Sequence, residues 1–177
     1  MDLRGLRQRC DVISRAVDLP TPFDLAAFRD RLAAARGRTI TLLPMTTGTA
    51  GNRPCGMWVA TEDADYVFFE EATSPLHRGH IVLHEFGHML CGHASSQLDE
   101  AELASLLLPD LDAAMVRRVL TRTSYTRVEE QEAEMTATLI LQRAGRSNRA
   151  ASTTAPEERA VLERLGSTLG HNHHTAP

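Results

Sequence analysis

The sequence predicts an α+β fold in which a small antiparallel sheet packs against helices. Apolar residues recur at helical spacing up to residue 36, give way to short strand-like runs between residues 39 and 69, and return to helical spacing from residue 75 onward. The chain has 177 residues, of which 42% are hydrophobic and 24% are charged. This size and balance are typical of one globular domain that buries its own core.

The first third of the chain is predicted to form two helices and then strands. Residues 2–17 and 23–36 carry apolar side chains at helical spacing, and Gly37 is the residue type preferred just past a helix C-terminus. Polar, turn-forming segments separate the runs that we expect to be strands, which are 39–43, 57–60 and 66–69. Three short strands in succession favour a small antiparallel sheet or meander.

The pattern becomes helical again after the strands. Ser74 is suited to cap a helix over 75–92, and Pro75 is suited to its first position. Further helices are expected at 97–107, 111–122 and 126–144.

The C-terminal residues have a different character. The small, polar segment 146–156 is interpreted as a linker, followed by a short helix over 157–168 and a mobile tail. We therefore expect residues 1–145 to form the functional domain and residues 146–177 to be a loosely attached segment.

Charge and cysteine content exclude several classes of protein. A net charge of −4 argues against nucleic acid or an anionic membrane surface as the direct partner. No apolar run approaches the roughly 20 residues that span a bilayer, and the first residues lack the apolar core of a secretory signal. Cys10, Cys55 and Cys91 lack the spacing of a disulfide scaffold or zinc finger. A cytoplasmic location is expected.

The residues that indicate chemistry are at 84–88, with the sequence His-Glu-Phe-Gly-His. His84 and His88 are four residues apart, so on a helix both imidazoles can reach one zinc ion. Glu85 lies slightly round the helix, where its carboxylate can hold water rather than the metal. Zinc lowers the pKa of that water, and Glu85 can take its proton as the water attacks a carbonyl.

A catalytic zinc needs a third protein ligand, and the sequence offers several. His93 lacks the spacing of the longer metzincin motif, and Cys91 is more simply explained as a small buried side chain. Glu130 shares a face of the later helix with Ala133 and Ala137, whose small side chains allow close packing. Glu130 is therefore our choice for the third ligand.

Other residues near these motifs have weaker indications. Glu134, one turn after Glu130, is the reserve ligand, whereas Glu129 and Glu132 fit a solvated acidic face. His80 is placed to approach the metal's outer partners, although a capping or solvent-facing role is the simpler interpretation. Tyr125 could donate a hydrogen bond to a developing oxyanion, with plain packing as the alternative. The strand at 66–69 could bind substrate backbone at the rim of the cleft, or serve only the core.

The two motifs together resemble the ImmA/IrrE family of zinc metallopeptidases. The resemblance spans about residues 20–143 and rests on 84–88 and on 130–137, which reads Glu-Gln-Glu-Ala-Glu-Met-Thr-Ala. It implies a zincin-like minimal metallopeptidase core, Zn²⁺ as cofactor, and Glu130 as the third ligand beside the two histidines. The chain departs from the family's usual aromatic residues at His80 and Thr136.

The resemblance also implies a function. Members of the family commonly cleave a helix-turn-helix repressor encoded beside them, or relieve its repression. We therefore expect an intracellular zinc endopeptidase that cuts a specific regulatory protein, with Glu85 as catalytic base. The alternatives are a metal-stabilised module that binds a repressor or toxin partner without cutting it, and a toxin with broad protease action.

Overall fold

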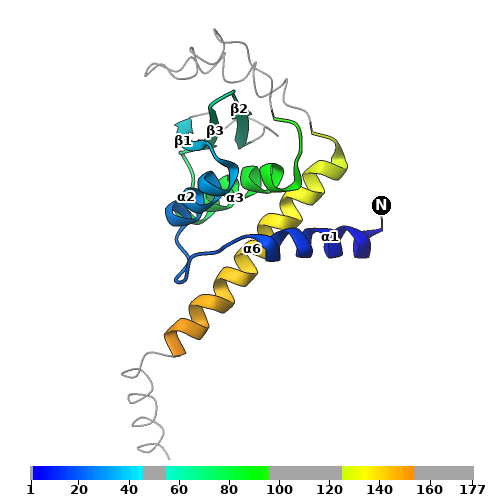
Figure 1. Ribbon diagram of the computed structural model, residues 1–177, viewed down its shortest axis with the longest axis vertical. Coiled ribbons are helices and arrows are strands. Elements are labelled where there is room, and N and C mark those ends of the chain that lie inside the picture. The colour runs from blue at the N-terminus through cyan, green and yellow to red at the C-terminus, as the bar shows by residue number, and fades with distance from the viewer. Residues whose placement is uncertain (1, 46–54, 96–124, 154–177) are drawn as a thin grey trace, which may run out of the picture.

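The computed structural model describes residues 2–45, 55–95 and 125–153. The helices expected at 97–107, 111–122 and 157–168 lie outside these residues, as does the tail. The α+β fold is confirmed (Figure 1). In chain order the described elements are α1 (Leu3–Ala16), α2 (Leu25–Arg36), β1 (Thr39–Met45), β2 (Gly56–Ala60), β3 (Ala64–Glu70), α3 (Pro75–Cys91) and α6 (Arg127–Thr153).

The sheet is mixed, so the expectation of an antiparallel sheet is wrong for one of its two pairings. The strand order is β1-β3-β2, in which β2 is antiparallel to β3 but β1 is parallel to β3. Successive strands alternate in direction, and a meander would keep β2 in the middle. Here β3 takes the central place, so it runs in the same direction as β1. Hydrophobic spacing reports which side chains face the core and carries no information on strand order.

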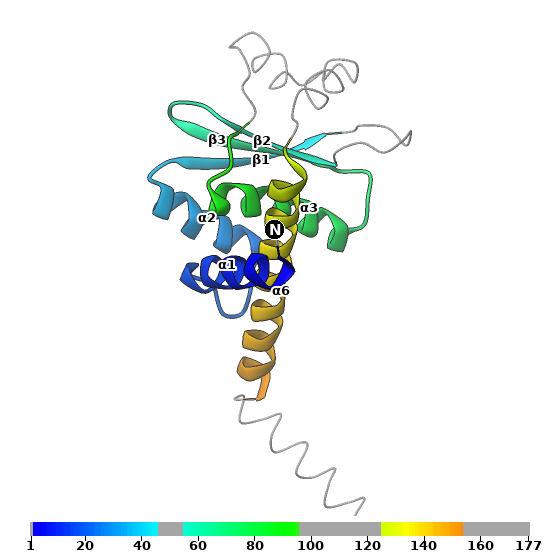
Figure 2. The ribbon, with the colours of Figure 1, turned by 90° about the vertical axis from the view of Figure 1, so that its right-hand side faces the viewer.

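The helices form a layer against one face of the sheet (Figure 2). α3 packs beneath the sheet, α6 crosses α3, and α1 lies across α6 on its other side. One core cluster joins α2, the sheet, α3 and α6, and it contains Phe28, Leu32, Ile40, Trp58, Val67, Val82, Leu83, Phe86, Met89, Ala137 and Ile140. A smaller cluster of Leu6, Cys10 and Leu139 attaches α1 to α6. The long helix α6 therefore contacts both α3 and α1.

The ends of α3 follow from local chemistry, as expected. The Ser74 hydroxyl accepts a hydrogen bond from the His77 backbone N–H at 3.2 Å, and Pro75 takes the first helical position. Gly92 ends the helix with a φ of 73°, a left-handed conformation that glycine adopts without strain. These caps fix where along the sheet the histidines of α3 are placed.

Helix α6 begins as predicted but ends later. Thr126 and Glu129 form a reciprocal capping box, with hydrogen bonds of 3.3 and 2.8 Å to each other's backbone N–H. The helix then continues to Thr153, so the linker interpretation is wrong for residues 146–153. The next proline is Pro156, and the Asn148 side chain accepts a hydrogen bond from the backbone N–H of Phe23 at 2.7 Å. Tertiary contact thus extends a helix that composition alone suggested would end.

The described helices have no apolar stretch long enough to cross a bilayer.

Candidate metal centre

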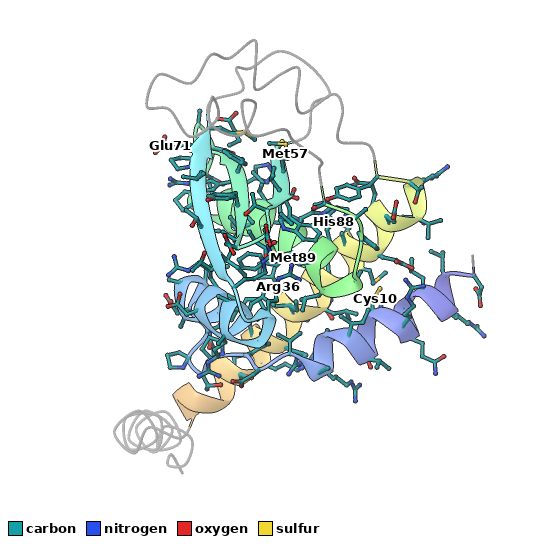
Figure 3. The ribbon with its side chains drawn as sticks, turned by 45° about the horizontal axis from the view of Figure 1, so that its top comes forward. Cys10, Arg36, Met57, Glu71, His88 and Met89 are labelled. Carbon is teal, nitrogen blue, oxygen red and sulfur yellow. The ribbon has the colours of Figure 1, made fainter. Side chains whose placement is uncertain are left out.

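Helix α3 presents two histidines toward one point. The Nε2 atoms of His84 and His88 are 3.1 Å apart, and the ring centroids are 4.8 Å apart. His88 is fully buried, and Figure 3 shows it on α3 near the start of α6. Burial, with smaller contributions from His84 and His93, lowers the pKa of His88 to about 3. His88 is therefore neutral at physiological pH, which is the form that binds metals.

Helix α6 brings Glu130 to the same point. Its Oε2 is 3.3 Å from His84 Nε2, and its Oε1 is 3.9 Å from His88 Nε2. One donor atom from each residue lies within 4.8 Å of the other two, so the three could hold a metal ion. The structure thus brings together all three residues that the sequence proposed as ligands.

A close approach between α3 and α6 allows Glu130 to reach the two histidines. A Cβ added at Gly87 would lie 2.5 Å from the carbonyl oxygen of Ala133 and 2.9 Å from its Cα. No side chain larger than hydrogen fits there without moving one of the helices. Ala133 and Ala137 are both fully buried, so the small-residue face of α6 is the face that meets α3.

The donor set and its spacing suit zinc. Two imidazole nitrogens and one carboxylate are a common ligand set for catalytic zinc, with a fourth position left for water or substrate. Two atoms that each lie about 2.0–2.1 Å from zinc in tetrahedral geometry are roughly 3.3 Å apart. The separations of 3.1, 3.3 and 3.9 Å observed here bracket that value.

Glu85 is buried beside these donors rather than among them. Only 4% of the residue is exposed, and its Oε2 has no hydrogen-bond partner among the residues described. Strand β2 covers it closely, since a Cβ at Gly56 would lie 2.7 Å from Glu85 Oε1. Burial and the nearby charge of Glu130 raise the pKa of Glu85 to about 8. A neighbouring cation would stabilise the ionised form of this buried carboxyl group, which is a second sign that the site suits a metal.

The raised pKa of Glu85 predicts how the metal-free protein responds to pH. The carboxyl of the folded protein keeps its proton up to about pH 8, while the unfolded chain loses it near its ordinary pKa of 4.5. The contribution of Glu85 to stability is thus complete below pH 4.5 and is lost as the pH rises through 8. In excess chelator, the Glu85→Gln variant should match wild type near pH 5. It should then become more stable than wild type by on the order of 1 kcal/mol per pH unit up to about pH 8.

Urea unfolding of both proteins at pH 5, 7 and 9 measures this difference directly. A difference in the free energy of unfolding that stays constant over this range would show that Glu85 titrates normally.

The three donors and Glu85 line one cavity of about 360 Å³. Tyr125 also lines it, and its ring stacks on that of His88 with centroids 3.6 Å apart. The Tyr125 hydroxyl is buried without a hydrogen-bond partner in the described part of the chain. Burial and the nearby carboxylates raise the pKa of Tyr125, so the hydroxyl keeps its proton and remains a donor. Its place in the cavity is compatible with the expected role as an oxyanion donor.

The reserve ligand Glu134 lies on the other side of His84. Its Oε2 is 3.4 Å from His84 Nδ1, the ring nitrogen that points away from His88, and 3.1 Å from His80 Nε2. Glu134 therefore contacts a candidate ligand rather than completing the donor set, and His80 contacts the same carboxylate.

The other two candidates form a second group behind the first. Cys91, His93 and Glu132 have one donor atom each within 4.8 Å of the others, so this group could also hold a metal ion. Glu132 is only 2% exposed and pairs with Arg9 of α1 at 2.7 Å, so the interpretation of Glu132 as part of a solvated face is wrong. The sequence feature that could have indicated this burial is the spacing of four residues between Glu132 and Thr136. Residues four apart lie on one face of a helix, and Thr136 is also fully buried.

The strand at 66–69 does not form a rim of the cleft. It belongs to β3, the central strand, whose two edges are already paired with β1 and β2. Strand addition needs an unpaired edge, so the substrate-binding interpretation of this strand is wrong. Gly56 of β2 is the sheet residue that lines the cavity.

Comparisons with protein-family models, with curated proteins and with solved structures found no match to this chain. The resemblance to the ImmA/IrrE family thus rests on the two motifs themselves.

Proposed function

We propose that the protein is an intracellular zinc-dependent endopeptidase with a zincin-like core. The observation that carries this proposal is the convergence of His84, His88 and Glu130 at one side of a cavity that also holds the buried carboxyl of Glu85. A purely structural metal site would have no need of a buried carboxyl, one of whose oxygens has no partner among the residues described, beside its ligands. A hydrolytic site needs one as proton carrier.

Each residue has a defined part in peptide hydrolysis. Zinc held by the three donors would supply Lewis acidity, which lowers the pKa of water and polarises a carbonyl group. The Glu85 carboxylate accepts a proton from the attacking water as the new C–O bond forms. It then delivers that proton to the departing amine nitrogen as the C–N bond breaks. The Tyr125 hydroxyl donates a hydrogen bond to the oxyanion that develops on the carbonyl oxygen.

A second hollow next to the donors suggests which side chain the substrate presents. This hollow measures about 580 Å³ and lies against α1 and α6, where His84, Glu130 and Glu134 border it. Leu3, Leu6 and Met135 give it an apolar lining, and Leu3 is 69% exposed. We propose that it receives an apolar side chain of a protein substrate close to the scissile bond.

The substrate that the resemblance suggests is a helix-turn-helix repressor encoded beside this protein. The test is to incubate that repressor with zinc-loaded protein and to map new N-termini by mass spectrometry, with chelator-treated protein as control. Cleavage at a defined bond that stops with chelator is expected. Loss of DNA binding by an intact repressor would instead favour a module that binds without cutting, and cleavage of many unrelated proteins would favour a toxin.

A further inference from the structure

We propose that His93, Glu132 and Arg9 form a buried relay that fixes the ring orientation and tautomer of His88. The inference rests on the proposed metal site, because it assigns a positioning role to residues behind one of its ligands. None of the three lines the cavity that holds the donors. Their effect on the metal would therefore pass through His88 alone.

The relay is a continuous row of short contacts from α1 to α3. Arg9 Nη2 is 2.7 Å from Glu132 Oε2, and the same oxygen is 3.0 Å from His93 Nε2. His93 Nδ1 is in turn 2.9 Å from His88 Nδ1. His88, His93 and Glu132 are each at least nine-tenths buried, so no bulk water competes for these contacts. Only Arg9 reaches solvent, with its side chain 53% exposed.

The chemistry of the groups gives the proposed relay one order of donors and acceptors. A carboxylate paired with a guanidinium accepts, so His93 donates from Nε2 to Glu132. The relay takes His93 as an imidazole with that single N–H, so its Nδ1 accepts. His88 therefore donates from Nδ1, which leaves its Nε2 as a bare lone pair facing the other donors.

Glu134 orients His84 from the opposite side. Its Oε2 lies 3.4 Å from His84 Nδ1, so this nitrogen is the donor and the ring turns its Nε2 toward His88 and Glu130. Two carboxylates behind the histidines thus orient both rings toward the site before a metal arrives.

A second metal at Cys91, His93 and Glu132 is the competing interpretation. Both ring nitrogens of His93 already have partners, and Glu132 Oε2 is shared by Arg9 and His93. Glu132 Oε1 has no partner among the described residues, but a metal ion there would still displace one contact of His93 and would sit next to the guanidinium charge of Arg9. The relay accounts for the contacts from Arg9 to Glu132, from Glu132 to His93 and from His93 to His88, so we favour it over a second ion. The two interpretations differ in the number of metal ions per chain.

The sharpest test is Glu132→Met, which removes the acceptor and keeps a side chain of similar length. A glutamine would not serve, because its carbonyl oxygen can accept from both Arg9 and His93 as Oε2 does. In Glu132→Met nothing holds the His93 proton at Nε2, so His93 no longer requires the Nδ1 proton of His88. Zinc affinity, measured by chelator competition, should fall about 10–100-fold, as substitutions behind a metal-binding histidine commonly cause. Glu129→Gln is the control, because it removes a carboxylate at a partly exposed position of the same helix turn and can still accept the Thr126 N–H hydrogen bond.

A second readout is independent of zinc and of activity. Imidazole ¹⁵N shifts of the metal-free protein should show His88 protonated at Nδ1 in wild type and in Glu129→Gln, but divided between Nδ1 and Nε2 in Glu132→Met. If Glu132→Met does not fold, Arg9→Gln serves instead, with Arg4→Gln as its exposed control on α1. Removing the guanidinium should weaken zinc binding several-fold while Arg4→Gln leaves it unchanged.

The outcomes separate this proposal from the proposed function. Unchanged zinc affinity and an unchanged His88 tautomer in Glu132→Met would overturn the relay and leave the metal site intact. A wild-type protein that fails to bind zinc while His88 is protonated at Nδ1 would overturn the proposed function and leave the relay's proton order standing. Two zinc ions per chain, with one lost in Cys91→Ala, would overturn the relay in favour of the second metal site.

Discussion

Replacing Glu85 by glutamine should abolish peptide hydrolysis and leave zinc bound. The amide has nearly the same shape as the carboxyl, and Glu85 is not among the three converging donors. It cannot accept the proton of the attacking water, so both proton transfers of the proposed reaction are lost. General acid–base groups contribute about 10²–10⁴-fold to a rate, and we expect kcat/KM to fall at least that far.

The measurement uses the bond found in the repressor assay, or the fastest bond cleaved in a mixture of proteome-derived peptides. Zinc content is measured in the same preparations. Glu129→Gln provides the control, since it removes a carboxylate from a partly exposed position outside the cavity. Hydrolysis at the wild-type rate by zinc-loaded Glu85→Gln would contradict the proposed mechanism.

A single methyl group at Gly87 should disrupt the metal centre from outside it. Gly87 lies where α3 meets α6, and an added Cβ would be 2.5 Å from the Ala133 carbonyl oxygen. Because that contact is with backbone, the helices must separate, which carries Glu130 away from the histidines. Overpacking of this kind costs about 1–3 kcal/mol of stability or more. We expect Gly87→Ala also to weaken zinc binding at least 10-fold.

The same helix provides a control variant whose expected effect on stability has the opposite sign. Gly79 is also within α3, and a Cβ there would meet nothing within 4 Å. Gly79→Ala should therefore stabilise the protein by about 0.5–1 kcal/mol, since alanine is the better helix former, and should leave zinc affinity unchanged. Thermal unfolding and zinc titration of both variants test the pair. Equal zinc affinity in Gly87→Ala and Gly79→Ala would show that the close approach does not position Glu130.

Local signals predicted much of the fold and of the site. The bounds of α3 follow from Ser74, Pro75 and Gly92, which act on their own neighbours in the chain. The pairing of His84 with His88 follows from helical periodicity alone. The position of Glu130 near them depended on one tertiary inference, that the small face around Ala133 packs on α3, and the structure shows this packing.

The features that the sequence did not predict depend on contacts between distant segments. The parallel pairing of β1 with β3 is set by which strand enters the middle of the sheet. Glu132 was expected to face solvent because its neighbours are charged, but α1 covers it and supplies Arg9 from more than a hundred residues earlier in the chain. Burial of a carboxylate costs too much free energy unless such a partner pairs with it, and local composition does not reveal that partner.

Zinc content per chain, measured by elemental analysis, shows whether His84, His88 and Glu130 form a zinc site. Wild type, Glu130→Ala and Glu129→Gln are purified side by side, dialysed against equal zinc and measured together; glutamine keeps the capping box at the start of α6. The metal centre proposed here predicts about one zinc per chain in wild type and in Glu129→Gln, and a clear loss in Glu130→Ala. Full retention of zinc by Glu130→Ala, or no zinc in wild type after reconstitution, would contradict it.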